Sequence, residues 1–488
     1  MYLKLIKDIN LKRYFKSTTS SEITLFILIS LIFGVVLVYM IPPLRGIDEV
    51  THFSRVYQIS EGGIRPLKLS NNTYGSNLPR NLINLNSAVY NEIENTGSNP
   101  NTSSKIKNLQ IQKTITLLSQ HLDKRDNLPW DSTGSSAYSP LAYIGPLTGT
   151  IIGKSLNLNI GNILFLSRLF SLFIYILIVT LALFIIRKKP IKWIVFITAL
   201  LPMSIFQASI INPDSLIISE SILIFSLYIY LWESKKENIE KWVLYVLALT
   251  LIILPLTKPN YILITIPLCF VPFNKISTNK KISFTFKVAT VIISTLCLLT
   301  WSYFTSGVTK TISQYRGTKI AGSININQQV HFILTRPLNF IIAILHSISQ
   351  YGNYWAQGIF GSLGWDNVAV PLLVIVLISM LYVIAIFNSK KLDSKDTILK
   401  YSFLATTIIT FLSILTIFYL TYNQVGFNTI YGIQGRYLIP LIPFLAYYLR
   451  KVIPINIVCT ENATKIIVSL GMTTSILISI LVYHAVIY

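Results

Sequence analysis

A cluster of ionisable side chains directly follows a long apolar segment near the start of the chain. Residues 23–41 are predominantly apolar, and about 20 such residues suffice to cross the hydrocarbon core of a bilayer. Pro42 and Pro43 should end that helix, because the proline ring removes an amide donor and clashes with the preceding turn. Five charged or titratable residues come next: Arg45, Asp48, Glu49, His52 and Arg55. The sequence therefore predicts reactive groups at a membrane surface.

These residue types suit the transfer of a group from a phosphate-linked lipid. A carboxylate can take the proton of an acceptor hydroxyl, and a positioned base contributes about 10²–10⁴-fold to a rate. Arginine and lysine can neutralise the departing phosphate, whose charge grows as its bond breaks. The sequence has no P-loop, dinucleotide glycine motif, zinc motif or Ser-His-Asp signature, so soluble nucleotide chemistry is not expected.

A short helix should position this cluster. Gly46 permits a turn after the prolines, and the pattern then predicts a helix that ends near Ser60. Spacings of four and three residues would bring three of the ionisable side chains to one face of it: Asp48, His52 and Arg55. The remainder of the chain is expected to hold that face at one membrane surface.

The composition predicts an all-α polytopic membrane protein. Of the 488 residues, 52% are hydrophobic and 12% are charged, and apolar runs alternate with short basic segments. The formal net charge is +22, but the basic residues gather between the apolar runs: Arg187-Lys188-Lys189, Lys235-Lys236, Lys280-Lys281, Lys390-Lys391 and Arg450-Lys451. That is the positive-inside pattern of cytoplasmic loops, which also meet anionic lipids. Nucleic-acid binding is therefore not expected.

The charge pattern also predicts a topology. Residues 1–450 should form one transmembrane domain, and residues 451–488 a C-terminal transmembrane helix. About eleven spans are expected: 21–41, 162–186, 192–211, 214–232, 241–256, 259–273, 283–305, 369–387, 400–420, 436–450 and 463–487. The other segments are a cytoplasmic tail (1–20), a first external loop (42–139), an interfacial helix (140–155), and a second external loop (306–368) with an interfacial helix at 337–350. The N-terminus is then cytoplasmic.

Further ionisable residues at the edges of spans extend the candidate site, because such groups are costly in a membrane and tend to be functional. They are Asp214, Lys258, Asp366 and Arg436. Arg168 lies inside a span and should face protein. The three cysteines, Cys269, Cys297 and Cys459, have no metal-ligand spacing and are expected to pack as small hydrophobic residues.

Simpler structural roles remain open for each candidate. Asp48 and Asp214 could cap the helices that follow them, and His52 and Arg55 could be solvated partners of Asp48. Lys258 and Arg436 could anchor helix ends at the lipid surface. The external tryptophans Trp130, Trp355 and Trp365 suit an interfacial belt as well as they suit sugar stacking.

The order of motifs resembles a bacterial family of predicted membrane proteins, domain of unknown function 2142. The resemblance covers residues from about 25 to 450. It rests on Pro43, Asp48-Glu49, His52, Arg55, residues 57–62, Tyr138-Ser139-Pro140, Pro202-Met203, Gln207, Asn212-Pro213-Asp214, Lys258, Tyr261, Gly435-Arg436-Tyr437, Pro440 and Pro443. An Asn- and Ser-rich insertion at 91–110 departs from the pattern and could alter the acceptor site.

That family is similar to the GT-C superfamily of integral-membrane glycosyltransferases, many of which use polyprenyl-phosphate sugars. The resemblance implies a GT-C-like bundle whose catalytic residues are Asp48, Glu49 and His52. Asp48 is the base, and Glu49 is its neighbour or a ligand for a divalent Mg²⁺ or Mn²⁺ ion; no other cofactor is expected. The resemblance further implies substrate binding by a set of basic, acidic and tyrosine residues: Arg45, Arg55, Tyr138, Asp214, Lys258, Tyr261, Arg436 and Tyr437.

The expected function is therefore sugar transfer on the external face of the bacterial cytoplasmic membrane. The donor would be a polyprenyl-phosphate sugar, and the acceptor a cell-surface glycan, lipid or polymer. Three rivals stay open: a transporter or flippase for lipid-linked saccharides, a polymerase or ligase that depends on Arg168 and Arg436, and a non-catalytic envelope scaffold. Polar residues concentrated at one membrane face disfavour the transporter, which needs mid-membrane sites.

Overall fold

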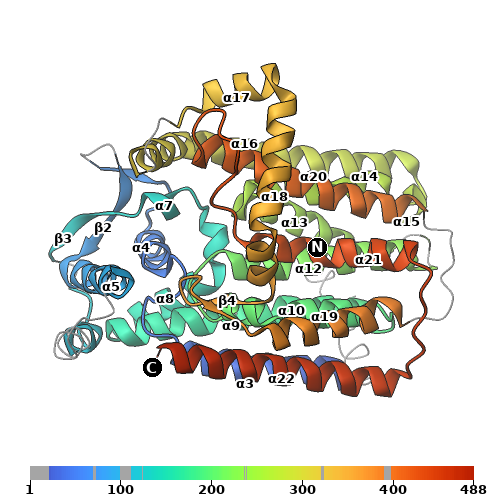
Figure 1. Cartoon of the computed structure of the whole chain (residues 1–488), viewed down its shortest axis with the longest axis horizontal. Coiled ribbons are helices and arrows are strands. Elements are labelled where there is room, and N and C mark those ends of the chain that lie inside the picture. The colour runs from blue at the N-terminus through green and yellow to red at the C-terminus, as the bar shows by residue number, and fades with distance from the viewer. Residues whose placement is uncertain are drawn as a thin grey trace, which may run out of the picture.

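The computed structural model describes residues 21–69, 73–98, 112–123, 125–235, 237, 239–319, 324–388 and 397–487. The expected tail at 1–20 and most of the insertion at 91–110 lie outside these residues. In the described part, long helices lie side by side along the longest dimension of the molecule, and a layer of short helices and strands covers one end (Figure 1).

The first part of the chain forms one long helix, the layer of short elements, and then a packed pair of helices. The elements are α3 (Ser21–Met40), α4 (Glu49–Ser60), β1 (Leu67–Lys68), β2 (Tyr74–Pro79), α5 (Arg80–Ser98), β3 (Asn127–Asp131), α7 (Thr133–Ser136), the 3-10 helix η1 (Pro140–Tyr143), α8 (Ile144–Ser155) and α9 (Ile160–Ile186).

The rest of the chain is mainly helical. Its elements are α10 (Lys192–Ala199), α11 (Pro202–Ala208), α12 (Asp214–Glu233), α13 (Lys241–Thr257), η2 (Pro259–Thr265), α14 (Ile266–Phe270), α15 (Phe273–Ile276), α16 (Lys280–Lys319), α17 (Ile326–Thr335), α18 (Pro337–Phe360), β4 (Ser362–Leu363), β5 (Val368–Ala369), α19 (Leu372–Phe387), α20 (Thr397–Tyr422), η3 (Gly435–Leu441), α21 (Ile442–Val452) and α22 (Glu461–Ile487).

The layer of short elements also contains short strands, which the sequence did not predict. Strands β1, β2 and β3 form an antiparallel sheet in that order, with Leu67 opposite Gly75 and Ser76 opposite Trp130. Strands β4 and β5 form a separate hairpin. These strands are short and rich in Asn, Ser and Pro, so they lack the alternation of apolar and polar residues that usually marks a strand.

Six described helices are long and apolar enough to cross a membrane: α3, α9, α12, residues 280–312 of α16, α20 and α22. They become seven if α17 and α18, which are bent by 105°, count as one span. A helical membrane protein is thus confirmed, whereas the described residues do not confirm the expected count of about eleven spans. Several expected spans are short or broken, and the cause is visible in two of them. Pro202 starts a new helix within 192–211, and 3-10 geometry with Pro440 occupies the start of 436–450.

The expected helix at 140–155 is present as η1 and α8, and α8 packs against α9. A Cβ atom on Gly149 would lie 2.4 Å from the carbonyl oxygen of Leu166 in α9. Only a residue without a side chain lets the two backbones approach this closely, as in the small-residue contacts of membrane helices. The pair fixes the start of α9 and thereby the position of Arg168.

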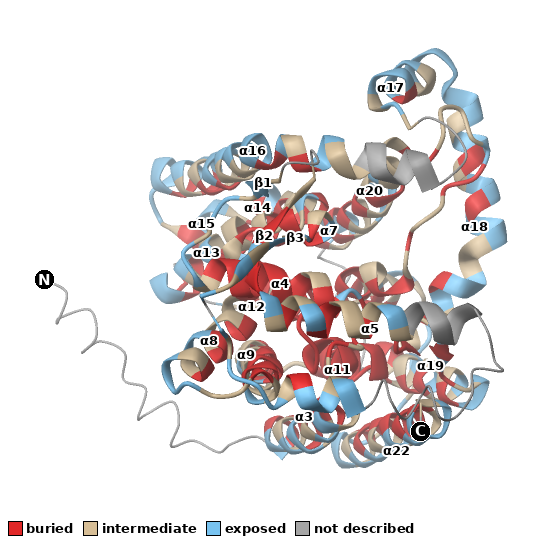
Figure 2. Cartoon of the chain, turned by 90° about the vertical axis from the view of Figure 1, so that its left-hand side faces the viewer, coloured by how far each residue is buried: buried red, intermediate tan, exposed pale blue. Residues whose placement is uncertain are grey.

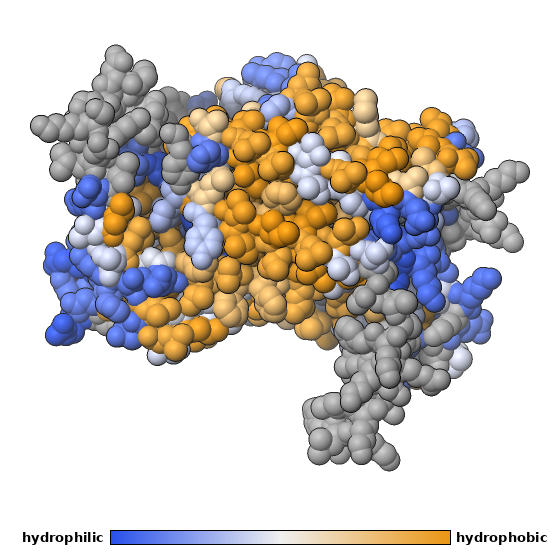
Figure 3. All heavy atoms as spheres, turned by 90° about the horizontal axis from the view of Figure 1, so that it is seen from below, coloured by the Kyte–Doolittle hydropathy of each residue, from blue (hydrophilic) through white to orange (hydrophobic). Residues whose placement is uncertain are grey.

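The two ends of the bundle carry different charged residues. At one end, which we call the lysine-rich end, Lys192 forms ion pairs with Glu22 and Glu461, and Lys189 lies 3.1 Å from Glu233. Helix α3 runs from this end to the segment that carries Asp48, which we call the Asp48 end. Twenty helical residues span about 30 Å, the thickness of a bilayer core. Figure 3 shows a broad apolar surface between two hydrophilic ends.

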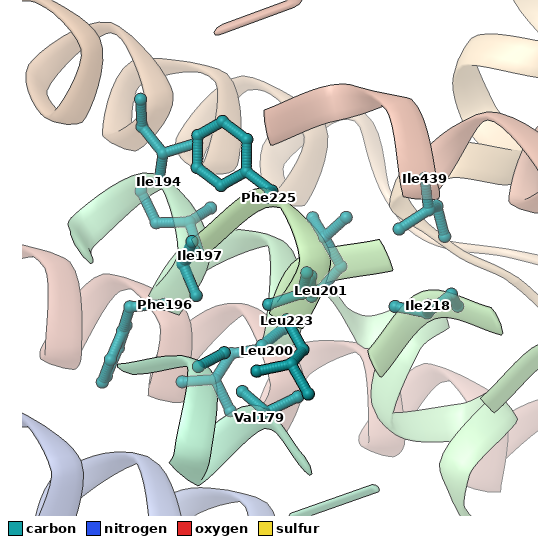
Figure 4. Packing of buried hydrophobic residues seen from close by; sticks show 14 of the residues in the cluster. Val179, Ile194, Phe196, Ile197, Leu200, Leu201, Ile218, Leu223, Phe225 and Ile439 are labelled. Carbon is teal, nitrogen blue, oxygen red and sulfur yellow. The ribbon is translucent and has the colours of Figure 1, made fainter. Parts of the chain in front are cut away.

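Helix α12 is the centre of the bundle. Of the most apolar stretch of this helix, 89% is buried inside the protein, the largest fraction among the six long helices. Figure 2 shows buried residues concentrated on α12 and the elements around it, and Figure 4 shows Ile218, Leu223 and Phe225 of α12 packed among side chains of neighbouring helices. Because α12 begins with Asp214 at the Asp48 end, this packing gives that carboxylate a rigid position.

Helix α18 is longer than the expected interfacial helix at 337–350 and lies across the bundle (Figure 1). Spacings of three, four and seven residues place exposed apolar side chains on one face of the N-terminal half of α18: Leu338, Ile341, Ile342, Leu345 and Ile348. The C-terminal half of α18 instead faces η3. A Cβ atom on Gly435 would lie 2.0 Å from the carbonyl oxygen of Trp355, so the glycine allows the close approach that places Arg436.

Candidate functional site

Asp48 lies between the end of α3 and the start of α4. Its backbone is left-handed, with φ 56°. Its side chain forms no capping hydrogen bond to α4, so Asp48 does not have the capping role that was considered for it. The left-handed region disfavours most residues but is tolerated by Asp and Asn. The side chain is 54% exposed, and its Oδ2 atom lies 3.9 Å from Nη2 of Arg436. Asp48 therefore combines solvent access with a cationic neighbour.

Arg436 is the buried cation that joins the two candidate carboxylates. It follows Gly435 in η3, is 5% exposed, and donates from Nε to Oδ2 of Asp214 at 2.7 Å. Its Nη1 atom is buried and has no hydrogen-bond partner in the described part of the chain. Because a buried donor without a partner is costly, Nη1 is a natural contact for an anionic ligand.

Asp214 and Lys258 complete the charged cluster. Lys258 Nζ lies 3.7 Å from Oδ1 of Asp214 and 3.3 Å from the centre of the Tyr437 ring. Helix α12 is capped by Asn212, whose Oδ1 accepts from the amide of Ser215, so Asp214 is free of the capping role that the sequence left open. It serves instead as the acceptor between two cations.

The tyrosines predicted to bind substrate surround these charges. Tyr261 donates its hydroxyl to the carbonyl of Tyr437 at 2.7 Å, and Tyr437 donates to Oε1 of Gln434 at 2.8 Å. Tyr138 lies against His52, with ring centres 5.4 Å apart, and burial raises the pKa of its hydroxyl. In this arrangement Tyr261 fixes the backbone of the Gly-Arg-Tyr segment, while Tyr437 supplies a ring face to both cations.

His52 is held as a neutral side chain beneath Asp48. Its Nδ1 atom and the Tyr143 hydroxyl share a hydrogen bond of 2.6 Å. Burial lowers its pKa to about 4, although the carboxylates of Asp48 and Asp214 favour the charged form. Neutral imidazole adds no charge to the cluster at neutral pH. Tyr143 ends the 138–143 motif but had no predicted role at the site, because an apolar 3-10 segment gives no signal of a polar contact across 91 residues.

We predict that His52 makes folding sensitive to acid. Its pKa is about 4 in the folded protein and about 6.5 in an unfolded chain, so its contribution is complete above pH 6.5 and is lost as pH falls toward 4. The slope is about 1.4 kcal/mol per pH unit for one proton. Thermal unfolding in detergent at pH 4–7 should show this fall for the native protein.

The same measurement on His52→Gln should lack this component, because glutamine can still accept from Tyr143 but does not titrate. His331→Gln is the matched control, since His331 is exposed on α17. An identical pH slope for the native protein and His52→Gln would contradict the assignment.

Glu49 occupies a structural position in spite of its place beside Asp48. It is fully buried, and Arg168 donates to it from Nε at 2.7 Å and from Nη2 at 2.6 Å. The amides of Gly46 and Ile211 donate to it at 3.0 Å each. Four donors fill the four lone-pair directions of a carboxylate, so in this conformation Glu49 positions Asp48 and has no lone pair left for a substrate or a metal ion. Losing one partner of such a buried pair typically costs about 3–5 kcal/mol.

Arg168, expected to face protein, is confirmed in that position at 3% exposure. It also donates to the carbonyls of Val38, Ile41 and Pro42, which close the C-terminal end of α3. This pairing ties the first span, the turn before Asp48 and α9 together. A role for Arg168 in polymerisation or ligation would require it to leave these partners.

Arg45 and Arg55 turn away from the cluster. Arg45 forms an ion pair with Glu92 at 2.7 Å. Arg55 donates to Oε1 of Gln58 and to three carbonyls, those of Gly63, Ile64 and Tyr138. The expected shared face of Asp48, His52 and Arg55 is therefore only partly formed, because the long Arg55 side chain folds toward the end of α4. Both arginines hold the local structure in this conformation.

The described residues do not fit a divalent metal ion. No group of three or more His, Cys, Asp or Glu side chains in the described ranges could hold one. Arg436 lies between Asp48 and Asp214, and Glu49 is saturated by its donors. Cations of the chain itself occupy the place of a metal between the carboxylates.

An aromatic cavity of about 240 Å³, which was not predicted from the sequence, lies next to this cluster. Trp355, one of the three tryptophans with an open role, lines it and is 4% exposed, so it is not a residue of the interfacial belt. Trp130 instead stacks on Tyr90 in the polar layer, with ring centres 6.3 Å apart. Two other contributors come from α18, where Tyr351 precedes Tyr354 by three residues and Trp355 by four, a helical spacing that could have revealed the surface.

Comparisons with known proteins place the chain in a family. No curated protein and no solved structure matches it. A family model described as "Predicted membrane protein (DUF2142)" matches residues 31–445, which include every residue of the charged cluster. The chain therefore belongs to the DUF2142 family of predicted membrane proteins.

Proposed function

We propose that this protein is an integral-membrane glycosyltransferase. It transfers a sugar from a polyprenyl-phosphate donor to a hydroxyl group of a cell-surface glycan, lipid or polymer. The observation that carries the proposal is the placement of Asp48, a half-exposed carboxylate 3.9 Å from a buried arginine whose Nη1 atom lacks a partner in the described residues. A base beside an anion-binding cation is what displacement of a phosphate requires.

The reaction is a direct displacement at the anomeric carbon. A carboxylate oxygen of Asp48 takes the proton of the acceptor hydroxyl, whose oxygen attacks that carbon. The bond from the carbon to the phosphate oxygen breaks, and its electron pair leaves on polyprenyl phosphate, which gains one negative charge. Arg436 and Lys258 bind this phosphate, and attack opposite the leaving group inverts the anomeric configuration.

The charges of the cluster support this chemistry. With Asp48 ionised, the two carboxylates balance Arg436 and Lys258. Proton transfer to Asp48 removes one negative charge as the phosphate gains one, so the summed charge of the site stays constant. Such preorganised compensation in a partly buried site lowers the cost of the transition state.

The GT-C resemblance agrees with the order of elements. An acidic residue follows the first apolar helix, short helices lie over it, and a broad apolar surface suits the polyprenyl tail. We further propose that the lysine-rich end is cytoplasmic and the Asp48 end extracytoplasmic in a bacterial cytoplasmic membrane, because basic loops stay on the cytoplasmic side.

This topology predicts opposite labelling of two cysteine variants in intact cells. In a background with Cys269, Cys297 and Cys459 replaced by serine, a membrane-impermeant maleimide should label Arg125→Cys at the Asp48 end. It should not label Lys188→Cys, which is exposed near the lysine-rich end. Both variants should react after the membrane is permeabilised. Labelling of Lys188→Cys alone in intact cells would show that the protein has the opposite orientation in the membrane.

The proposed activity is tested with the full chain in proteoliposomes. A panel of polyprenyl-phosphate hexoses carrying labelled sugar is supplied with an extract of envelope glycans and lipids. We expect release of polyprenyl phosphate together with label in an acceptor, and neither product with protein-free vesicles. Translocation of intact donor without cleavage of the sugar–phosphate bond would contradict transfer and favour a flippase.

The flippase remains a second candidate because of one buried residue. Glu220 lies within α12, is 3% exposed, and its Oε2 atom has no hydrogen-bond partner in the described residues. Ionisable groups inside spans often mark transport or proton pathways. Transport that is lost in Glu220→Gln but kept in Asp48→Asn would identify this function.

A further inference from the structure

The aromatic cavity lies between two parts of the chain that meet beside Arg436. Helix α18 contributes Tyr351, Tyr354 and Trp355, and the segment between α20 and η3 contributes Tyr422, Tyr431 and Gln434. The ring centres of Tyr351 and Trp355 are 6.5 Å apart with planes tilted by 30°, and Tyr431 stands edge-on to Tyr351 at 5.7 Å. Aromatic faces on both parts therefore enclose the same space.

The cavity is coupled to the charged cluster by short structural links. Gln434 is two residues before Arg436 and accepts from the Tyr437 hydroxyl at 2.8 Å. Trp355 lies under Gly435, where a Cβ atom would meet its carbonyl oxygen at 2.0 Å. A group bound in the cavity would therefore be adjacent to the two cations that we assign to the phosphate.

The lining indicates the chemistry of the ligand. Ring faces can cover the apolar C–H face of a sugar ring, while the tyrosine hydroxyls and the Gln434 amide can bond its equatorial hydroxyls. The described residues that line the cavity include no lysine or arginine, which disfavours a phosphate, and the polar groups disfavour a plain alkyl chain. The volume of about 240 Å³ is below the roughly 300–1,000 Å³ of pockets for drug-sized ligands.

We propose that this cavity is a subsite for a single pyranose ring next to the reacting centre. Tyr351, Trp355 and Tyr431 supply the stacking faces, and Gln434 supplies an amide to the hydroxyls. Tyr354, which donates its hydroxyl to Asp366, also lines the cavity. The ring belongs either to the lipid-linked donor or to the acceptor glycan. This subsite deepens the proposed function and rests on it.

Binding is measured by saturation-transfer NMR with the full chain in nanodiscs. The probes are the methyl pyranosides of glucose, galactose, mannose and N-acetylglucosamine. We expect transfer to the ring C–H protons of at least one probe, and a loss of at least tenfold in affinity in Tyr431→Ala. Tyr354→Ala is the second variant, because Tyr354 is 40% exposed and its truncation leaves the core intact. Tyr303→Ala, at a 77% exposed tyrosine on α16, should bind as the native protein does.

Two competitors identify the source of the ring. If sugar-loaded farnesyl phosphate displaces the probe and bare farnesyl phosphate does not, the cavity holds the donor sugar; if neither displaces it, the cavity holds the acceptor. Displacement by both alike would overturn the proposal, as would equal binding by the native protein and both cavity variants, or no transfer to any probe.

The outcome is separable from that of the proposed function. Asp48→Asn should bind the probe normally even where sugar transfer is lost. Normal sugar transfer combined with unaltered probe binding in both cavity variants would remove the subsite and leave the transferase standing.

Discussion

Asp48→Asn is expected to lower sugar transfer by about 10²–10⁴-fold, the usual contribution of a positioned general base. The amide cannot accept the proton of the acceptor hydroxyl. It has nearly the same shape as the carboxylate, and asparagine tolerates the left-handed backbone found here, with φ 56°. Because the native side chain forms no capping bond, folding should change little. The rate of label transfer from the polyprenyl-phosphate donor measures the effect.

The control is Asp123→Asn, which makes the same chemical change at an aspartate that is also about half exposed and whose carboxylate pairs with Arg125. It should transfer sugar at the native rate. Thermal unfolding should show that both variants are folded. A folded Asp48→Asn protein with near-native transfer would eliminate Asp48 as the base.

The meeting of Asp48, Lys258 and Arg436 could be predicted from the sequence. Each residue stands at the edge of an apolar run, and the positions of the basic segments assign all three edges to the same end of the bundle. The structure confirms that convergence through Asp214, with 3.9 Å between Asp48 and Arg436. Charge asymmetry fixes which end a residue occupies, although it does not fix which residues touch.

The parts that escaped prediction depend on contacts between distant segments. Glu49 and Arg168 are separated by 119 residues, and nothing in either sequence window shows that one neutralises the other. The direction of Arg55 depends on carbonyls presented by the turn after α4. The broken helices follow from prolines such as Pro202 and Pro440. A mean hydropathy over many residues does not reveal the break that a single proline causes. Local patterns predict elements, and packing decides which side chains remain free to act.

Arg436→Gln is expected to lower kcat/KM for the lipid-linked donor by about 10²–10³-fold, the range found when one donor to a developing anion is removed. Arg436 lies 2.7 Å from Asp214 and keeps Nη1 unpartnered within the described residues. It can therefore serve the phosphate while it holds Asp214. Arg436→Lys keeps the charge but loses the planar fork of donors, so it should recover only part of the rate.

A purely structural role for Arg436 makes a different prediction. Arg436→Gln leaves Asp214 with Lys258 as its remaining cation, at 3.7 Å, so the single variant is expected to lose stability as well as activity. The double variant Arg436→Gln/Asp214→Asn removes both charges and should recover the unfolding temperature without recovering kcat/KM. If the double variant instead regained native transfer, the arginine would serve only to neutralise Asp214. Recovery of stability without recovery of activity would show that Arg436 does more than form an ion pair with Asp214. Its charge would then also be needed for the leaving phosphate.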